Sequence, residues 1–382
     1  MCRRSPSASS PSEARGSAVT RLPPLDPAVA ETRVAVRLAL GALASDHAVP
    51  PTAGAPGDVA GPTENRGTEP VAADPGSRAP LVLVALSGGA DSLALAAAIA
   101  FEAPRAGVGV GALIVDHGLQ EDSAEVAARA AEQARGLGLE PVLVRRVEIP
   151  REGSSDGDRR AGPNSGPETG AAMMLTAHTR DDQAEQVLLA LARGSGTRAI
   201  AGIPRVRDRI FRPFLEVSRR TTEAACRAQG LEPWRDPHNA DPAYTRVRVR
   251  ERVLPVLEAE LGPGIAANLA RSAELAREDA DALDEMARLQ LGQLAPSAWP
   301  GTTMELPILE LSMQHAALRQ RIIRTAARER FGSHLSREHT LAIAALVTEW
   351  RGQGPVYAPG LRVTRRGDAL VFERQLGSPR SS

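Results

Sequence analysis

Short apolar runs alternate with segments of helical periodicity through the first half of the chain. We predict strands at 81–86, 108–115, 141–147 and 173–177, and helices at 28–44, 93–101, 123–136 and 181–192. Apolar runs of this length are typical of strands buried on both faces, as in parallel sheets. The alternation of strands and helices therefore indicates a parallel, Rossmann-like α/β sheet with right-handed crossovers.

The pattern becomes mostly helical after residue 213 and ends in a small β unit. Helices are predicted at 221–228, 244–261, 265–291, 309–331 and 336–349, and short strands at 355–357, 361–364 and 370–372. We therefore expect an α/β domain at 27–230, a helical connector at 231–295 and a small α+β domain at 296–376.

Four segments lack periodicity and are rich in Gly, Pro, Ser or Asp. They are an N-terminal extension at 1–26, which we predict to be disordered, loose insertions at 45–80 and 150–170, and a tail at 377–382. The 150–170 insertion is unusual because a crossover between parallel strands normally carries a helix.

The composition is that of a soluble globular protein with more than one folded unit. The 382 residues are 42% hydrophobic and 24% charged, and the formal net charge is zero. A neutral chain argues against a protein that holds nucleic acid by bulk charge, although a local basic face is compatible with it. The chain contains no Lys, so each fixed positive side chain is a planar guanidinium.

Cysteine content and hydropathy indicate a cytoplasmic protein with no membrane partner. Cys2 and Cys226 are too few for a disulfide framework and lack metal-ligand spacing. No apolar run reaches the roughly 18 residues that a membrane helix needs. Residues 1–24 also lack the apolar core of a secretory signal.

The strongest chemical signal is a Gly-rich loop between the first predicted strand and its helix. The loop consists of Ser87, Gly88, Gly89, Ala90, Asp91 and Ser92. The glycines let backbone N–H groups turn inward, the serines add hydroxyl donors, and the helix presents its positive N-terminus to an anion. No Lys follows the glycines, so this is not a Walker A loop. It suits the pyrophosphate of ATP, with Asp91 as a ligand of Mg²⁺; the alternative is a serine-capped turn.

Acidic side chains follow other predicted strands, at the sheet edge where α/β proteins bind ligands. Asp116 follows the second strand, and Asp181, Asp182 and Glu185 follow the fourth. Asp182 and Glu185 are three residues apart, so they share one helix face and suit an amine or a metal ion. The alternatives are a turn role for Asp116 and helix capping for the paired aspartates.

Several strings, taken in order, resemble the tRNA(Ile)-lysidine synthetases of the PP-loop ATP pyrophosphatase superfamily. They are SGGADSLAL at 87–95, VDHGL at 115–119, AHTRDDQAE at 177–185, LARGSGTRAIAGI at 191–203, RPFL at 212–215 and DPHNADPAYTRVRVRERVLPVLE at 236–258. The resemblance covers about 81–149 and 171–372, and the order and spacing of the strings make it specific.

The resemblance implies a sheet of the PP-loop type and a two-step reaction on an isoleucine tRNA with a CAU anticodon. ATP adenylates O2 of the wobble cytosine, and the amine of free lysine then displaces AMP at C2 to give lysidine. The implied catalytic residues are Asp91, Asp116, Asp181, Arg193 and Arg212. The implied lysine ligands are Asp182 and Glu185, with 87–92 on the ATP phosphates and Mg²⁺ on Asp91. The sequence leaves a homodimer open.

Arginines in the 236–258 string are the candidate contacts to tRNA. Arg246, Arg248, Arg250 and Arg252 alternate along a predicted helix, where 246/250 and 248/252 form two neighbouring rows. A second group lies near the C-terminal unit, at Arg319, Arg321, Arg324 and Arg328. The alternative for both groups is a solvated helix face paired with acidic neighbours.

The chain departs from the family pattern, and two other functions compete with lysidine formation. A family helix with an Ala-Arg-x-x-Arg-Tyr type motif is replaced by 150–170, Gln186 stands where Thr is usual, and Val247 stands where Asn is common. The missing helix motivates a degenerate, non-catalytic tRNA-binding homologue. The other competitor is a PP-loop tRNA thiolation enzyme, which would need a sulfur relay beyond the isolated Cys226.

Replacing Arg246 and Arg250 together should weaken tRNA binding and flatten its dependence on salt. Each lost phosphate contact lowers the slope of log K against log salt by roughly one unit. Filter binding of isoleucine tRNA at several salt concentrations measures this slope. An unchanged slope would show that neither guanidinium contacts a phosphate.

Overall fold

The computed structural model describes residues 25–46, 80–118, 122–147, 170–295 and 302–375. Most of the segments at 1–26, 45–80, 150–170 and 377–382, for which we predicted loose structure, lies outside the described residues. Within the described part, no helix is long and apolar enough to cross a bilayer.

A six-stranded sheet forms the centre of the first domain, in the order β3-β2-β1-β4-β6-β5. Its strands are β1 (Leu81–Ala85), β2 (Gly109–Asp116), β3 (Val142–Arg146), β4 (Met173–Leu175), β5 (Val206–Arg207) and β6 (Ile210–Phe211). All neighbours are parallel except β5 and β6. The predicted parallel α/β sheet is therefore confirmed, with a short antiparallel edge that the sequence pattern did not predict.

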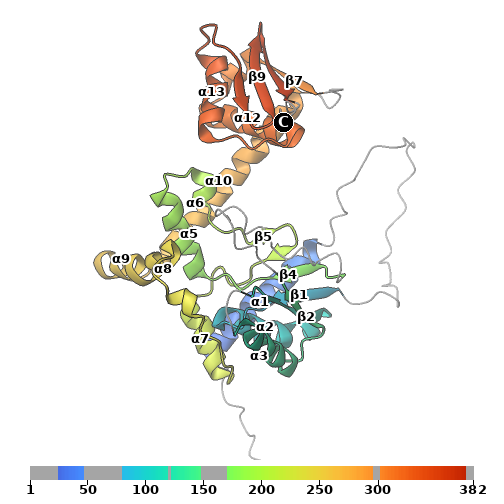
Figure 1. The fold of residues 1–382 in the computed structure, drawn as a ribbon, viewed down its shortest axis with the longest axis vertical. Helices are drawn as coiled ribbons and strands as arrows, with labels where there is room; N and C mark the ends of the chain where they lie inside the picture. The colour runs from blue at the N-terminus through green and yellow to red at the C-terminus, as the bar shows by residue number, and fades with distance from the viewer. Residues whose placement is uncertain (1–24, 47–79, 119–121, 148–169, 296–301, 376–382) are drawn as a thin grey trace, which may run out of the picture.

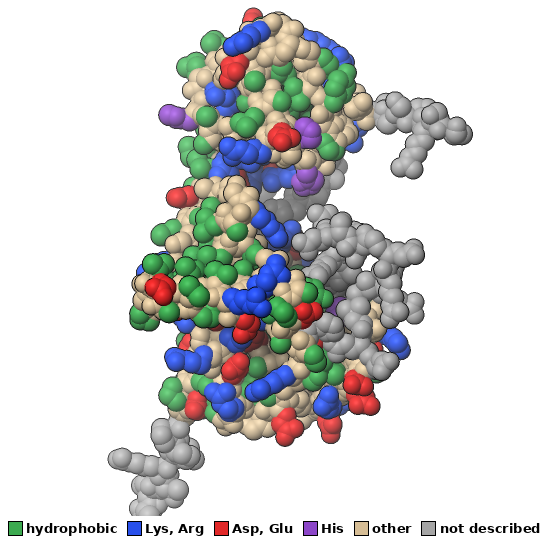
Figure 2. All heavy atoms as spheres, turned by 60° about the vertical axis from the view of Figure 1, so that its left-hand side comes forward, with side chains coloured by type: hydrophobic (Ala, Val, Ile, Leu, Met, Phe, Trp, Pro, Cys, Tyr) green, Lys and Arg blue, Asp and Glu red, His purple; other side chains and the backbone are tan. Residues whose placement is uncertain are grey.

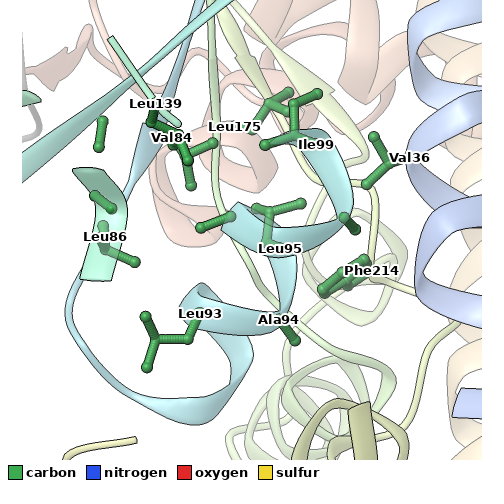
Figure 3. Packing of buried hydrophobic residues seen from close by; sticks show 14 of the residues in the cluster. Val36, Val84, Leu86, Leu93, Ala94, Leu95, Ile99, Leu139, Leu175 and Phe214 are labelled. Carbon is green, nitrogen blue, oxygen red and sulfur yellow. The ribbon is translucent and has the colours of Figure 1, made fainter. Parts of the chain in front are cut away.

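Helices cover this sheet and bury its apolar strands. They are α1 (Pro27–Asp46), α2 (Ala90–Glu102) with the short η1 (Ala103–Ala106), α3 (Ser123–Gly136), α5 (Arg180–Ala192), α6 (Thr197–Ile200) and α7 (Arg219–Ala228). Helices α1, α2 and α7 pack on one another. Figure 3 shows the resulting core, in which Val84, Ile99 and Phe214 come from distant parts of the chain and are fully buried.

The chain order reverses beside β1, and this reversal positions the candidate site. From β1 the chain moves outward through β2 and β3, then returns to place β4 on the other side of β1. The loops that follow β1 and β4 consequently diverge at the carboxyl edge of the sheet. In doubly wound sheets, ligands bind in the crevice at such a switch point.

A helical region connects this domain to the C-terminal unit. It comprises η2 (Pro237–Ala240), α8 (Thr245–Arg248), the π-helix η3 (Val249–Val253), α9 (Leu254–Leu261) and α10 (Ile265–Leu294). The single helix predicted at 244–261 is therefore interrupted by a π-helical turn. The 30-residue α10 packs on α5 at one end and on the C-terminal unit at the other, as Figure 1 shows.

The C-terminal unit packs three helices on an antiparallel sheet of order β7-β10-β9-β8. Its elements are β7 (Thr303–Pro307), α11 (Ile308–Met313), α12 (Ala316–Phe331), α13 (Arg337–Thr348), β8 (Val356–Ala358), β9 (Leu361–Arg366) and β10 (Ala369–Arg374). The expected α+β unit is confirmed. The predicted helix at 309–331 is two helices, because Gln314 and His315 adopt extended backbone.

Replacing Gly111 by Ala should destabilise the central sheet. A Cβ at Gly111 would lie 2.5 Å from the Pro141 carbonyl oxygen and 2.9 Å from Leu83 Cδ2, whereas at Gly109 on the same strand the nearest atom would be 3.8 Å away. We expect Gly111→Ala to lower the free energy of unfolding by about 1–3 kcal/mol through overpacking. Urea denaturation measures the change. Gly109→Ala is the matched control, and an equal effect of both variants would contradict the account.

Candidate functional site

The Gly-rich loop forms the turn between β1 and α2. Gly88 has φ +83°, in the left-handed region that favours glycine, and Gly89 directly precedes the helix. The Ser87 and Ser92 hydroxyls lie 3.2 Å apart, and the Ser92 hydroxyl donates to the Gly89 carbonyl oxygen at 3.0 Å. The loop thus places two hydroxyls beside the N–H groups of a 13-residue helix, a geometry suited to phosphate oxygens.

Asp91 lies in the first turn of α2 and faces α7. One of its carboxylate oxygens accepts a hydrogen bond from the Thr222 hydroxyl, and the other lies 3.4 Å from Arg219 Nε. Burial raises the pKa of Asp91, and the Thr222 hydrogen bond and the Arg219 charge offset part of that rise. Asp91 is therefore a partly buried carboxylate directly beside the Gly-rich turn.

Arg219 connects the acidic groups that follow β1 with those that follow β4. Its side chain contacts Asp182 at 3.1 Å and Glu185 at 3.5 Å as well as Asp91, and its backbone N–H donates to Asp181 at 2.8 Å. Burial alone would lower the pKa of Arg219, but the surrounding carboxylates outweigh it and raise that pKa. One guanidinium therefore holds the two halves of the site together.

Glu185 is fully buried and receives guanidinium groups from the helical connector. Arg250 donates two hydrogen bonds to it, at 2.7 Å from Nε to Oε1 and 3.0 Å from Nη2 to Oε2. A bidentate pair of this kind is the strongest geometry available to arginine and carboxylate. Arg246 Nε forms an ion pair with the same Oε2 at 3.0 Å, without the geometry of a hydrogen bond. Arg246 and Arg250, which we predicted to contact tRNA, thus contact Glu185, which we predicted to bind lysine.

Asp182 combines a capping role with its place in the acidic cluster. Its Oδ2 accepts from the Thr179 backbone N–H at 2.8 Å while the Thr179 hydroxyl caps the helix in return, which forms a capping box. Burial would raise the pKa of Asp182, but the Arg219 charge and the Thr179 hydrogen bonds outweigh it and lower that pKa. Its other oxygen, Oδ1, faces Arg219 and the interior of the site.

Asp116 and His178 both lie at the carboxyl edge of the sheet, on either side of β1. Asp116 is buried at the end of β2 and accepts the Gly118 N–H at 3.0 Å, a hydrogen bond that lowers the pKa of Asp116. His178 follows β4 and its Nδ1 lies 3.0 Å from the Thr176 hydroxyl, while burial lowers the pKa of His178. Their hydrogen-bond partners, Gly118 and Thr176, do not belong to the cluster of acids around Arg219.

The structure places the remaining predicted arginines in varied surroundings. Arg212 is buried after β6 and donates to the Pro204 carbonyl oxygen at 2.8 Å, while its Nε has no hydrogen-bond partner among the described residues. Arg193 is exposed at the end of α5. Arg248 donates to the carbonyl oxygens of Pro242 and Ala243 and therefore supports the turn before its own helix.

The second arginine group is divided between structural and exposed positions. Arg321 is buried and pairs with Asp284 of α10 at 2.7 Å, which ties the C-terminal unit to the connector. Arg328 is half-exposed and lies 3.2 Å from Glu329 on its own helix. Figure 2 shows positively charged side chains along the waist of the molecule, between the first domain and the C-terminal unit.

Sequence reasoning missed Arg219 and Thr222 as members of the site. Both lie at the start of α7, where Ser218 caps the helix by accepting from Thr221 N. Arg219 is far along the chain from Asp91 and Asp182, so only the sheet topology reveals their proximity. The one available signal was the N-cap pattern Ser-x-x-Thr, which places the next residues at a helix N-terminus.

The fold and the Gly-rich turn define a PP-loop protein, and residues 63–257 match the model of the PP-loop domain. Proteins called tRNA(Ile)-lysidine synthase share high identity with the chain. The one from Leifsonia xyli subsp. xyli is 57% identical over 76% of this chain and 89% of its own length. Those from Salinispora tropica and Streptomyces coelicolor are 51% and 47% identical, each over 78% of this chain and 91% and 86% of their own lengths. The chain belongs to the tRNA(Ile)-lysidine synthase family.

Cys226 should be chemically inert in the folded protein. It is buried in α7 and donates to the Ala90 carbonyl oxygen, and burial raises the pKa of its thiol to about 12. At pH 8 the thiolate that reacts with iodoacetamide is therefore scarce. We expect peptide mass spectrometry to find Cys226 unmodified under native conditions and alkylated in urea. Rapid native alkylation would show that the thiol is accessible and activated.

Proposed function

We propose that this protein ligates lysine to C2 of the wobble cytidine of the CAU-anticodon isoleucine tRNA. The reaction forms a C–N bond, converts ATP to AMP and pyrophosphate, and passes through a cytidine adenylated at O2. The observation that carries this proposal is one cluster in which Arg219 joins Asp91 of the ATP-binding loop to Asp182 and Glu185. A phosphate site and an amine site next to each other fit both half-reactions.

The ATP-binding part of the proposal uses the turn after β1. The backbone and hydroxyls of 87–92 cradle the phosphates, and the pyrophosphate leaves from the N-terminus of α2. Asp116, at the end of the adjacent strand, is assigned to the nucleotide side of the same edge. Arg193 and Arg212 are assigned to charge on the nucleotides or in the transition state.

Mg²⁺ enters the proposal as an ion carried by ATP. Among the described residues, no three His, Cys, Asp or Glu form a metal-binding group. Mg²⁺ usually takes one or two protein carboxylates together with substrate phosphates, and a single carboxylate beside the phosphate turn fits this mode. Asp91 would hold the ion, which would neutralise phosphate charge.

The lysine-binding part uses Asp182 and Glu185. Their carboxylates lie on one face of α5, and Asp181 holds Arg219 through its backbone N–H. An ammonium needs oxygen acceptors around it when it leaves water, and two carboxylates supply them. Because the chain places these acids next to Asp91, the amine would lie close to the adenylated base.

We assign tRNA binding to arginines of the connector and to the C-terminal unit. Arg246, Arg248 and Arg250 would contact backbone phosphates near the anticodon. Adenylation and lysine transfer belong to 27–230, the connector at 231–295 carries these arginines, and 296–376 binds the body of the tRNA. We place the reaction in the cytoplasm, where tRNA, ATP and free lysine are present.

Incorporation of labelled lysine into tRNA tests this function. We expect lysine to be incorporated only when ATP and isoleucine tRNA are both present, with pyrophosphate released in equal amount. A thiolation enzyme would release pyrophosphate without regard to lysine, and a non-catalytic tRNA-binding protein would release none. Either result would contradict the proposal.

Asp182→Asn should raise the KM for lysine at least about tenfold and leave the KM for ATP within about twofold. The amide keeps an oxygen that can cap the helix at Thr179, so the variant removes charge with little loss of helix stability. Steady-state kinetics with each substrate varied in turn provide the measurement. An unchanged KM for lysine would remove Asp182 from the amine site.

A further inference from the structure

The carboxylates that we assign to the lysine amine are paired with arginines of the same chain. Glu185 is contacted by Arg219, Arg246 and Arg250, and Asp182 by Arg219 and, at 3.8 Å, by Arg250. A lysine ammonium that arrived at this cluster would have to compete with guanidinium groups already in place. The proposed function does not explain how the site becomes free.

The arginines of the cluster differ in how they are held. Arg219 is 22% exposed and is fixed from several sides by Asp91, Asp182 and its own backbone contact to Asp181. Arg246 is 41% exposed and Arg250 is 23% exposed, and within the described residues their acidic partners are Asp182 and Glu185. These two guanidiniums can therefore rotate away without disturbing the loop that binds ATP.

The backbone beneath Arg246 and Arg250 stays anchored when their side chains move. Val249 and Leu254 pack with Ala184 of α5 in a small apolar cluster. The π-helical turn η3 carries Arg250, and such turns occur mostly at functional sites. Apolar packing thus holds the backbone of this segment in place, while its arginine side chains can change position.

We propose that Arg246 and Arg250 set the order of substrate binding by closing the amine site until tRNA phosphates draw them away. The inference rests on the proposed function and adds regulation to its lysine site. Phosphate offers guanidinium the same bidentate geometry as a carboxylate. Once the two arginines leave, the fully buried Glu185 keeps only the 3.5 Å contact to Arg219. A buried carboxylate needs a compensating cation, so the lysine ammonium takes the place of the arginines.

This exchange makes lysine binding dependent on tRNA and, by linkage, tRNA binding dependent on lysine. The apparent affinity for lysine is reduced by the fraction of molecules whose site is open, and tRNA raises that fraction. Coupling between two binding sites is reciprocal, so lysine must strengthen tRNA binding by the same factor. Neither effect requires the reaction to take place, so both can be measured without ATP.

Equilibrium dialysis of labelled lysine against the full-length protein, without ATP, tests the exchange. We expect lysine to bind at least about tenfold more tightly when unmodified isoleucine tRNA is present, and filter binding to show an equal gain in tRNA affinity with saturating lysine. Equal lysine affinity with and without tRNA would overturn the inference. These arms use only the wild-type protein, so they decide the question even if a variant fails to fold.

Arg250→Gln provides the second arm, with Arg248→Gln as its matched control. Arg248 lies in the same arginine string but contacts Pro242, Ala243 and Thr245 rather than the acidic cluster. We expect Arg250→Gln to bind lysine at least about tenfold more tightly than wild type in the absence of tRNA, and Arg248→Gln to bind it as wild type does. Folded Arg250→Gln protein with unchanged tRNA-free lysine affinity would overturn the inference.

Turnover separates this inference from the proposed function. If wild-type protein forms lysidine while its lysine affinity ignores tRNA, the function stands and the exchange is wrong. If it forms no lysidine and binds no lysine with or without tRNA, both are wrong.

Discussion

A fully buried carboxylate needs a positive partner, and this requirement organises the centre of the molecule. Glu185 has no solvent exposure, so Arg219, Arg246 and Arg250 surround it from two directions. Arg219 also reaches Asp91, which brings the start of α2 to the start of α5. Removing one partner of a buried pair leaves an uncompensated charge, at a cost of about 3–5 kcal/mol. The ion-pair cluster consequently ties the α/β domain to the helical connector.

The sheet topology makes this cluster possible. Because β4 returns to the side of β1 opposite β2, the Gly-rich turn and the acidic helix α5 begin at neighbouring points on one edge. Helix α7 contributes Arg219 and Thr222 to this edge. Its contacts with α1 and α2 fix this position through apolar packing. The chemistry that we propose thus depends on the order of the strands in the sheet, and polar contacts then fix the positions of the side chains.

Much of the fold could be predicted from the sequence because its signals are local. The bounds of α3 are those expected, since Ala127, Ala130, Ala131 and Ala134 mark one buried helix face. Strand β7 was not predicted, although Met304 and Leu306 point inward and Glu305 outward, because an alternation of only five residues gives a weak signal. The interruption at 309–331 has no Pro or Gly at the break, whereas Pro255, in the first turn of α9, was a local signal for the interruption at 244–261, because proline removes a backbone hydrogen bond from a helix.

The candidate site could be predicted only in part. The loop at 87–92 and the acids of α5 follow strands directly, so their place at the sheet edge follows from strand assignment. The partners of those acids come from α7 and η3, and nothing in the local pattern specifies which arginine meets which carboxylate. We predicted that Arg250 contacts a phosphate, and in the structure it is paired with Glu185. This pairing depends on the tertiary packing of η3 on α5, which the local sequence does not specify.

A structure of the protein with isoleucine tRNA and lysine tests the central claim most directly. The account predicts the lysine ammonium within hydrogen-bonding distance of Asp182 and Glu185, with the Arg250 guanidinium on a tRNA phosphate. Lysine bound elsewhere, with Arg250 still paired to Glu185, would contradict it.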